Sequence, residues 1–341
     1  MRLYTGKDIS KLSVFIPGNS GIFAIIDNKV EEYFSAMKNW KFITVSAKES
    51  NKTLSEAGWI CSRLMEMGAD RDCFIIGAGG GMTTDLAGFV ASIYKRGVRF
   101  AFVPTTLLAA ADASIGGKNG VNHLAVKNMI GTVTQPEWVY QSPVFFPTLP
   151  VRVFREGIAE ILKTFMIFDA DLYGFAVSFF TGYNHVNHCE KEERLLERIV
   201  KESARLKIKA VSKDEKDKGA RRVLNLGHTF AHGIESWGAG NNRKILHGEA
   251  VAAGIVASAK VSSALGLCRK SFAAELEEDF RSVGLPSSFG IGFSQIYKAL
   301  QQDKKVSGEN VTLVLPQDIG VVSLEEIKLE HLRKICSRMT V

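Results

Sequence analysis

The sequence predicts a chain of two domains: an α/β domain built on a parallel sheet, at residues 1–150, and a mainly α-helical domain, at residues 151–341. Up to about residue 150, short apolar runs rich in β-branched and aromatic residues alternate with helix-like segments. Such alternation is typical of βαβ units, whose strands pair in parallel. After the stretch FFPTLP the apolar runs nearly disappear, and long segments of helical periodicity follow.

The apolar runs and the helical periodicities place the elements along the chain. In the first domain we expect a helix at 54–67 and strands at 13–16, 22–27, 41–45, 73–76, 99–103 and 138–140. The domains are expected to join near residues 147–154. In the second domain, residues 190–211 and 248–265 repeat apolar residues at helical spacing, and VTLVLP at 311–316 predicts a late strand.

Composition and charge are those of an ordinary globular protein, with 46% hydrophobic and 23% charged residues. The sequence shows neither a signal-peptide pattern nor an apolar stretch approaching about 18 residues, so we expect a cytoplasmic protein without a membrane partner. The five cysteines form no C-x-x-C pair, which favours reduced thiols over disulfides. The net charge of +7 is spread among acidic residues, which favours anionic small molecules over nucleic acid as partners.

The stretch CFIIGAGGGMTTDLAGFVAS, at 73–92, is a candidate phosphate loop. Its apolar start predicts a buried strand, and the glycines at 77, 79, 80 and 81 predict a sharp turn into a helix. A turn of this kind directs main-chain N–H groups at an anion, and phosphate is the expected ligand. The spacing matches neither G-x-G-x-x-G nor the P-loop, so a tight turn without a ligand is the alternative.

Candidate metal ligands lie in the helical half. In LNLGHTFAHGIE, His228 and His232 stand four residues apart and share one helix face. ILHGEAVAAG offers His247 at a helix start, and GIAEILKTF places Glu160 and Lys163 one turn apart. A glutamate and two histidines from separate helices would form a three-ligand site with an open position, which is the catalytic form of a zinc site. The alternative for each histidine is a capped or core residue.

The segment PTTLLAAADASIGGKNGVNHLAVKNMIG gathers polar residues in a glycine-rich stretch that is too apolar to be a solvated loop. Its lysines suit a multiply oxygenated anion, because ammonium and main-chain N–H donors together offset the desolvation of a phosphate or carboxylate. The same reasoning applies to Lys207, Arg221 and Asn225. We expect His123 to line this site. The histidines expected at the surface are His185, His188 and His331.

Together these motifs resemble the 3-dehydroquinate synthases, a family of sugar-phosphate cyclases. The similarity extends from about residue 47 to residue 320, and its motifs occur in the family's order: GGG…DLAGFVAS, RGVRF, VPTTLLA, D-x-S-x-GGK, KNMIG, F-x-TLP, G-x-AEILK, DE…G-x-R-x-x-LNLGHTFAH, LHGEAVAAG and DKK. The ordered set is far more specific than any one match. The resemblance implies a Rossmann-like domain that binds NAD, a helical domain that holds a divalent metal, and an active site in the cleft between them.

The resemblance also assigns residues to the two cofactors. Glu160, His228 and His247 correspond to the family's metal ligands, and such donors suit zinc or cobalt. His232 corresponds to a residue that faces the substrate, which corrects the spacing argument. The implied NAD shell consists of Asp27, Glu49, Lys52, Gly80, Gly81, Met82, Thr83, Thr84, Asp85, Thr105, Thr106, Lys118, Lys127, Phe145 and Thr148. Thr84 replaces the family's usual glycine, and because a β-branched residue resists positive φ, we expect a different local bend there.

Other matched positions imply contacts with an anionic substrate. They are Asp112, Lys118, Asn128, Lys163, Lys207, Arg221, Asn225, His232 and one of Lys304 or Lys305. Among them, Lys207 and Arg221 are expected to bind a carboxylate. Arg96 matches an arginine that reaches a phosphate across a dimer interface, so a homodimer is expected.

The implied activity belongs to the shikimate pathway of aromatic amino acid biosynthesis. It converts 3-deoxy-arabino-heptulosonate 7-phosphate to 3-dehydroquinate and phosphate through transient oxidation by NAD, phosphate elimination, re-reduction and intramolecular aldol closure. Another cyclase, of the 2-deoxy-scyllo-inosose or valiolone type, would use a substrate without the carboxylate. A metal-dependent alcohol dehydrogenase of the glycerol dehydrogenase kind would not need so many lysines directed at phosphate. A non-enzymatic binding protein would not need both a metal triad and a dinucleotide loop.

Overall fold

The computed structural model describes residues 1–341 except 17, 19, 125, 218 and 302–305, and it gives only the main chain of residues 306 and 307. The chain forms two compact units: Met1–Leu149 with His185–Lys216, and Pro150–Asn184 with Asp217–Val341. The first unit contains a parallel sheet and the second is mainly helical, as the sequence predicts. Residues 185–216, which the prediction assigned to the second domain, pack with the first unit instead.

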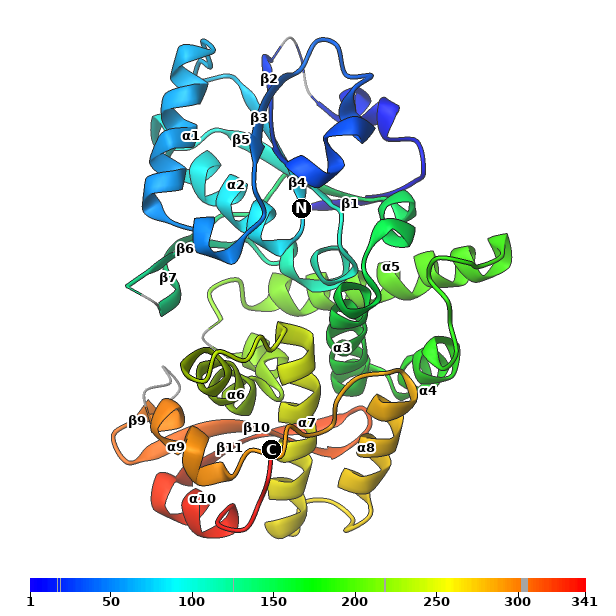
Figure 1. Ribbon diagram of the computed structural model, residues 1–341, viewed down its shortest axis with the longest axis vertical. Coiled ribbons are helices and arrows are strands. Elements are labelled where there is room, and N and C mark those ends of the chain that lie inside the picture. The colour runs from blue at the N-terminus through cyan, green and yellow to red at the C-terminus, as the bar shows by residue number, and fades with distance from the viewer. Residues whose placement is uncertain (17, 19, 125, 218, 302–305) are drawn as a thin grey trace. The chain divides into compact units, whose positions relative to one another are not determined.

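The first unit is built on a six-stranded sheet (Figure 1). Its strands pair in parallel in the order β1-β8-β5-β4-β2-β3. The bounds are β1 Arg2–Thr5, β2 Ile22–Asp27, β3 Lys41–Val45, β4 Phe74–Gly79, β5 Arg99–Pro104 and β8 Trp138–Gln141. Its helices are η1 Ile9–Phe15, η2 Asn28–Phe34, η3 Glu49–Asn51, α1 Leu54–Glu66, α2 Gly81–Ile93, η4 Tyr94–Arg96, η5 Ala109–Ala113, η6 Pro143–Thr148 and α5 Glu190–Lys213.

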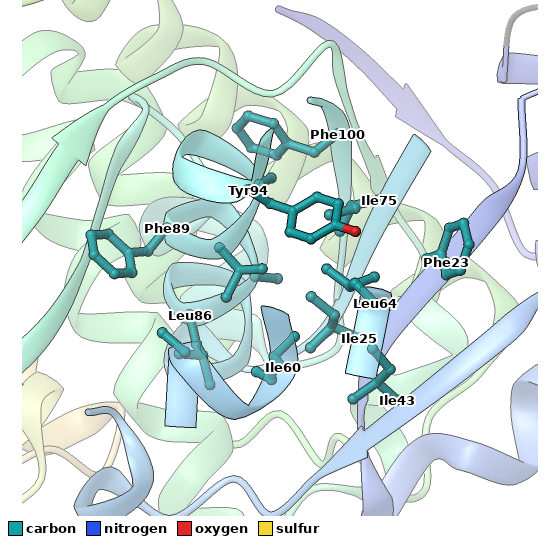
Figure 2. Close-up of a cluster of buried hydrophobic side chains, with 14 of the residues drawn as sticks. Phe23, Ile25, Ile43, Ile60, Leu64, Ile75, Leu86, Phe89, Tyr94 and Phe100 are labelled. Atoms are coloured by element: carbon teal, nitrogen blue, oxygen red, sulfur yellow. The ribbon is translucent and has the colours of Figure 1, made fainter. Parts of the chain in front are cut away.

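Both faces of this sheet are covered, so successive residues of a strand alternate between two hydrophobic cores. In β2, Phe23 and Ile25 belong to the core that α1 and α2 complete, whereas Ala24 and Ile26 belong to the core that η1 and η2 complete. Figure 2 shows the first of these cores, in which side chains of α1 and α2 meet those of the strands. The central strands are therefore buried on both faces, so a ligand-binding site can form only at the ends of these strands.

The predicted strands are confirmed except the one at 13–16, which is wrong because these residues lie in or next to the 3-10 helix η1. Asp8 caps this helix, since its side chain accepts a hydrogen bond from the Ser10 main chain at 3.0 Å. Ile9 and Leu12 are both buried, and a spacing of three residues fits one side of a 3-10 helix rather than one face of a strand. The short edge strand β1 carries too few apolar residues to have been predicted.

A two-stranded antiparallel hairpin lies outside the main sheet, in the segment that the sequence shows only as glycine-rich. It consists of β6 (Lys118–His123) and β7 (Val126–Val133). Helix α2 packs against β6, so the hairpin belongs to the first unit. The hairpin therefore packs on α2, the helix that begins at the glycine-rich turn.

The second unit is arranged around α7, a helix of mostly small apolar residues that contacts α3, α6, α8 and β10. The bounds are α3 Val151–Phe168, α4 Ala170–Phe180, η7 Ala220–Asn225, α6 His228–Gly240, α7 His247–Ala264, α8 Phe272–Ser282, α9 Phe293–Gln301, β9 Val306–Ser307, β10 Asn310–Asp318, β11 Val321–Lys328 and α10 Leu329–Ile335. The predicted late strand is confirmed as part of β10, which pairs with β9 and β11. Across the described residues, no helix is long and apolar enough to cross a membrane.

Two glycines in neighbouring helices should respond oppositely to alanine. In α2, a Cβ at Gly88 would lie 2.1 Å from Asn119 Oδ1, and the Asn119 amide is held by Gly117 and Thr134 main-chain oxygens. We predict that Gly88→Ala lowers the free energy of unfolding by about 2 kcal/mol, as overpacking does. In α1, a Cβ at Gly58 would meet nothing within 4 Å, so Gly58→Ala should raise it by about 0.5–1 kcal/mol. Urea unfolding measures both, and equal stability of the two variants would contradict this packing.

Candidate active site

Glu160, His228 and His247 come together in the second unit. Glu160 lies within α3, whereas His228 and His247 are the first residues of α6 and α7. One ligand atom of each residue lies within 4.8 Å of those of the other two. Each histidine presents Nε2 to the carboxylate, at 3.7 Å from Glu160 Oε1 for His228 and 3.3 Å for His247. The set is a candidate centre for a divalent metal.

Close main-chain approaches bring the two histidines into place. Gly227, which precedes His228, has a φ of +77°, and a Cβ there would lie 2.7 Å from a side chain of α7. A Cβ at Gly248, next to His247, would lie 2.4 Å from the main-chain oxygen of Glu156 in α3. Side chains are excluded at both positions, so the starts of α6 and α7 can lie directly against neighbouring helices.

Glu160 is completely buried, and its charge is balanced locally. Its side chain forms an ion pair with Lys163, one turn later in α3. Burial alone would raise the pKa of Glu160, but Lys163 and His247 hold it well below its ordinary value. Burial alone would lower the pKa of His247, but the carboxylates of Glu160 and Glu235 raise it to about 10. Among the described residues, neither oxygen of Glu160 receives a well-oriented hydrogen bond, so the carboxylate retains lone pairs for a cation.

The second nitrogen of each imidazole lies near an acceptor. His228 Nδ1 is 3.2 Å from the main-chain oxygen of Leu226, and His247 Nδ1 is 3.6 Å from Glu235 Oε1. Metal-binding histidines commonly donate their other N–H to a carbonyl or carboxylate, which leaves Nε2 as the ligand atom. The donor set and its surroundings therefore fit a divalent ion, and nitrogen and oxygen donors suit zinc or cobalt.

His232 lies beside this set without belonging to it. Its ring centroid is 5.9 Å from that of His228, in an edge-to-face arrangement. Within the described part of the chain, it is absent from the group whose ligand atoms converge. A spacing of four residues puts both side chains on one face of α6, but the first residue of the helix is the one that reaches Glu160.

The glycine-rich turn of the first unit lies at the switch point of the sheet. β2 leads to β3 on one side and β4 leads to β5 on the other, so the ends of β2 and β4 lie side by side. Gly80 caps α2, whose first N–H groups have no partner within the helix. Ligands of open α/β sheets bind at such switch points, and a helix start favours an anion. Asp27, at the end of β2, is buried and caps η2.

Thr84 lies in a regular helix, and its φ is not positive, as expected of a β-branched residue. It is completely buried in the first turn of α2. Its hydroxyl donates to the main-chain oxygens of Gly80 and Gly81, at 3.3 and 3.1 Å. Local back-bonding of this kind allows a threonine to sit in a helix. Thr83 is also buried, and its Oγ1 lacks a hydrogen-bond partner in the described structure.

A hydrogen-bond network connects the glycine-rich turn to the hairpin. Lys52 Nζ lies 2.5 Å from both Asp85 Oδ2 and Asn128 Oδ1. The Asn122 amide donates to Glu49 Oε1 at 2.7 Å, and its oxygen accepts from the Asn128 main chain at 2.9 Å. Asn128 itself adopts a φ of +51°. Residues predicted for NAD, such as Lys52, thus contact a residue predicted for the substrate.

A pocket of about 350 Å³ lies beside this network. Its lining residues are Glu49, Ser50, Thr53, Asn122, His123, Leu124 and Lys127. The volume lies within the range of small-molecule sites. Glu49 and Lys127, both predicted for the cofactor, and His123, expected to line the site, therefore surround one pocket of the first unit.

Asp112 and Lys207 form a further contact between predicted substrate residues. Lys207, in α5, donates to the main-chain oxygen of Asp112 at 2.8 Å and pairs with its carboxylate at 2.7 Å. Asp112 belongs to η5, a single π-helical turn, and such turns are frequent at functional sites. The ammonium group is therefore fixed on Asp112 in this structure.

The other predicted residues differ in exposure. Those that are exposed or half-buried are Met82, Arg96, Thr106, Lys118, Thr148 and Asn225. Those that are buried are Thr105, Phe145 and Arg221. The Phe145 ring has no exposed surface and packs on Tyr33 at a centroid distance of 5.0 Å, so its side chain belongs to the core. Lys304 and Lys305 lie outside the described residues.

Sequence reasoning missed Glu235, and it placed Asn122 among the polar residues of the glycine-rich segment without predicting its contacts with Glu49 and Asn128. Glu235 follows His228 by two helical turns, and that spacing on one face could have identified it. Asn122 acts across a hairpin that no local pattern predicted. Among the histidines expected at the surface, His331 is exposed and His188 half-buried. His185 is buried, with Nε2 2.8 Å from the main-chain oxygen of Leu149, so that expectation was wrong.

The chain matches known proteins over most of its length. Residues 42–156 match the family model described as 3-dehydroquinate synthase N-terminal, and residues 157–306 match the one described as 3-dehydroquinate synthase C-terminal. The 3-dehydroquinate synthase of Buchnera aphidicola subsp. Cinara cedri (strain Cc) is 40% identical over 306 residues, which cover 88% of this chain and 80% of the relative.

Solved structures share the fold. A 2-deoxy-scyllo-inosose synthase complexed with carbaglucose-6-phosphate, NAD+ and Co2+ has a TM-score of 0.85 at 23% identity, over 98% of this chain and 96% of that one. ValA, the 2-epi-5-epi-valiolone synthase from Streptomyces hygroscopicus subsp. jinggangensis 5008 with NAD+ and Zn2+ bound, also has a TM-score of 0.85 at 23% identity, over 98% and 94%. At this identity the likeness concerns the fold alone.

Loss of Lys52 should destabilise the first unit, because the largely buried carboxylate of Asp85 would no longer be paired with the Lys52 ammonium group. Their side chains are 5% and 18% exposed, and burial raises the pKa of Asp85 more than Lys52 lowers it. We predict that Lys52→Met lowers the free energy of unfolding by about 2–3 kcal/mol, and that adding Asp85→Asn restores more than half of this loss. Urea unfolding without ligands measures both, and additive effects of the two changes would contradict the coupling.

Proposed function

Because the chain belongs to the 3-dehydroquinate synthase family, we propose that it converts 3-deoxy-arabino-heptulosonate 7-phosphate to 3-dehydroquinate and phosphate. The observation behind this proposal is that the buried Glu160 and the half-buried His228 and His247 converge in the second unit. The first unit of the same chain has a glycine-rich helix start at the switch point of its sheet. The proposed sequence is transient oxidation, phosphate elimination, re-reduction and aldol closure. The enzyme is thereby a carbon–oxygen lyase, since the bond to phosphate breaks without net oxidation.

NAD would supply a hydride acceptor that is returned to its starting state. The start of α2 at Gly80 and Gly81 suits the pyrophosphate, and the pocket lined by Glu49 and Lys127 suits another part of the dinucleotide. A divalent metal held by the glutamate and the two histidines would supply Lewis acidity at a substrate hydroxyl.

The remaining polar residues would bind and orient the anionic substrate. Lys163 keeps Glu160 ionised, so that this carboxylate is ready to bind a cation. Asp112, fixed by Lys207, offers acceptor oxygens for a substrate hydroxyl. Arg221 is buried and supplies a planar donor pair that fits a carboxylate. The other residues proposed to contact the substrate are Lys118, Asn128, Asn225 and His232.

A homodimer is part of the proposal. Arg96 matches the family's arginine that reaches a phosphate across a dimer interface. It is exposed and adopts a φ of +71° at the turn between α2 and β5. Its position at a turn suits a residue that acts on a second copy of the chain.

The activity itself is tested by product analysis. Protein supplied with NAD and zinc or cobalt should release inorganic phosphate from the heptulosonate phosphate and form 3-dehydroquinate, without accumulating NADH absorbance. Chelation should stop turnover, and the metal should restore it. NADH accumulation with glycerol would instead identify an alcohol dehydrogenase. Phosphate release only from a sugar phosphate without a carboxylate would identify another cyclase.

Arg221 tests the choice of substrate. Arg221→Ala should raise the barrier for kcat/KM on the heptulosonate phosphate by roughly 2–4 kcal/mol, because a charge-assisted and bidentate contact with the carboxylate is lost. Arg221→Lys should recover only part of this loss, since an ammonium lacks the planar fork. Binding of NAD and metal should persist in both variants. Equal losses on a sugar phosphate without a carboxylate would argue against this role.

A further inference from the structure

Glu235 lies directly outside the candidate metal centre. It is in α6, two helical turns after His228, and its side chain is 11% exposed. Its Oε1 lies 3.6 Å from His247 Nδ1, whereas Nε2 of the same ring lies 3.3 Å from Glu160 Oε1. The imidazole of His247 is therefore contacted at both nitrogens by carboxylates, one from α3 and one from α6.

The two histidines of the centre are held in different ways. His228 has a side chain that is 15% exposed, and its Nδ1 is near the main-chain oxygen of Leu226, which the fold itself fixes. His247 has a side chain that is 33% exposed, and the acceptor near its Nδ1 is the side chain of Glu235. The orientation of the His247 ring therefore depends more on one replaceable side chain than that of His228 does.

The main chain around His247 is anchored independently of Glu235. Arg152 of α3 donates through two nitrogens to the Glu249 carboxylate, at 2.6 and 2.7 Å, and also to the Lys244 main-chain oxygen at 2.8 Å. Glu249 in turn accepts from the main-chain N–H of Leu246 at 3.0 Å. These contacts fix the start of α7 and leave the ring of His247 to be oriented by its two carboxylate neighbours.

We propose that Glu235 is a positioning residue that orients His247 through Nδ1 and raises the affinity of the centre for its divalent metal. This inference rests on the proposed metal centre. An acceptor at Nδ1 keeps the proton on that nitrogen, so Nε2 presents its lone pair beside Glu160. The negative charge of Glu235 also makes the imidazole a stronger ligand.

The test measures metal binding rather than turnover. Metal-free protein is titrated with Co²⁺ against a chelating dye, and the visible absorption of the bound ion is recorded. Glu235→Ala should bind Co²⁺ about 10–100-fold more weakly, with a changed spectrum, and Glu235→Gln should lie between Glu235→Ala and the wild type because an amide keeps an acceptor without the charge. Glu277→Gln is the matched control, since Glu277 is a partly buried glutamate of the same unit that pairs with Lys260.

The outcomes separate this inference from the metal centre itself. Tight binding by the wild type together with an unchanged affinity and spectrum in Glu235→Ala would overturn the role of Glu235 and leave the centre standing. A wild type that binds neither Co²⁺ nor Zn²⁺ would overturn both. If circular dichroism shows that Glu235→Ala does not fold, Glu235→Gln decides, and wild-type affinity in that variant overturns the inference.

Discussion

The buried charge of Glu160 is the constraint on which the arrangement of the second unit depends. A carboxylate without exposed surface costs several kcal/mol to desolvate unless opposite charges surround it. Lys163 supplies one, and the first residues of α6 and α7 bring two imidazoles to the same oxygen. Because buried ion pairs add little to stability compared with apolar packing, this arrangement is better explained by a site than by folding.

The glycines at the helix starts show how the chain meets this constraint. Gly227 and Gly248 leave no side chain where α6 and α7 press against their neighbours. A larger residue at either position would move a histidine away from Glu160. The position of the two histidines therefore depends partly on residues that have no functional group. Arg152 also anchors the start of α7 through its hydrogen bonds with Glu249.

Paired charges recur in the first unit, among residues proposed to bind ligands. Lys52 contacts Asp85 and Asn128, and Lys207 contacts Asp112. Such pairs hold ammonium groups in place within a partly buried setting, so less side-chain freedom is lost when an anion arrives. A phosphate that bound to these ammonium groups would compete with the carboxylate or amide that they already contact.

Sequence reasoning succeeded where one local pattern determines structure. The strands β2, β4 and β5 are apolar runs buried on both faces, and the motifs around Glu160, His228 and His247 carried the metal prediction. It failed where the outcome depends on distant partners. The spacing of His228 and His232 does not say which one meets α3, and the apolar residues of η1 are buried in a core formed with the distant strands β2 and β4. Contacts such as that of Lys52 with Asp85 join segments far apart in the sequence, so no single segment reveals them.

The most direct measurement of the central claim is an anomalous difference map from crystals of the cobalt-loaded protein. We predict a single strong peak in the second unit, about 2.0–2.2 Å from a Glu160 oxygen, His228 Nε2 and His247 Nε2. A peak bound through Nδ1 of either histidine, a peak that includes His232 as a ligand, or no peak beside Glu160 would contradict it.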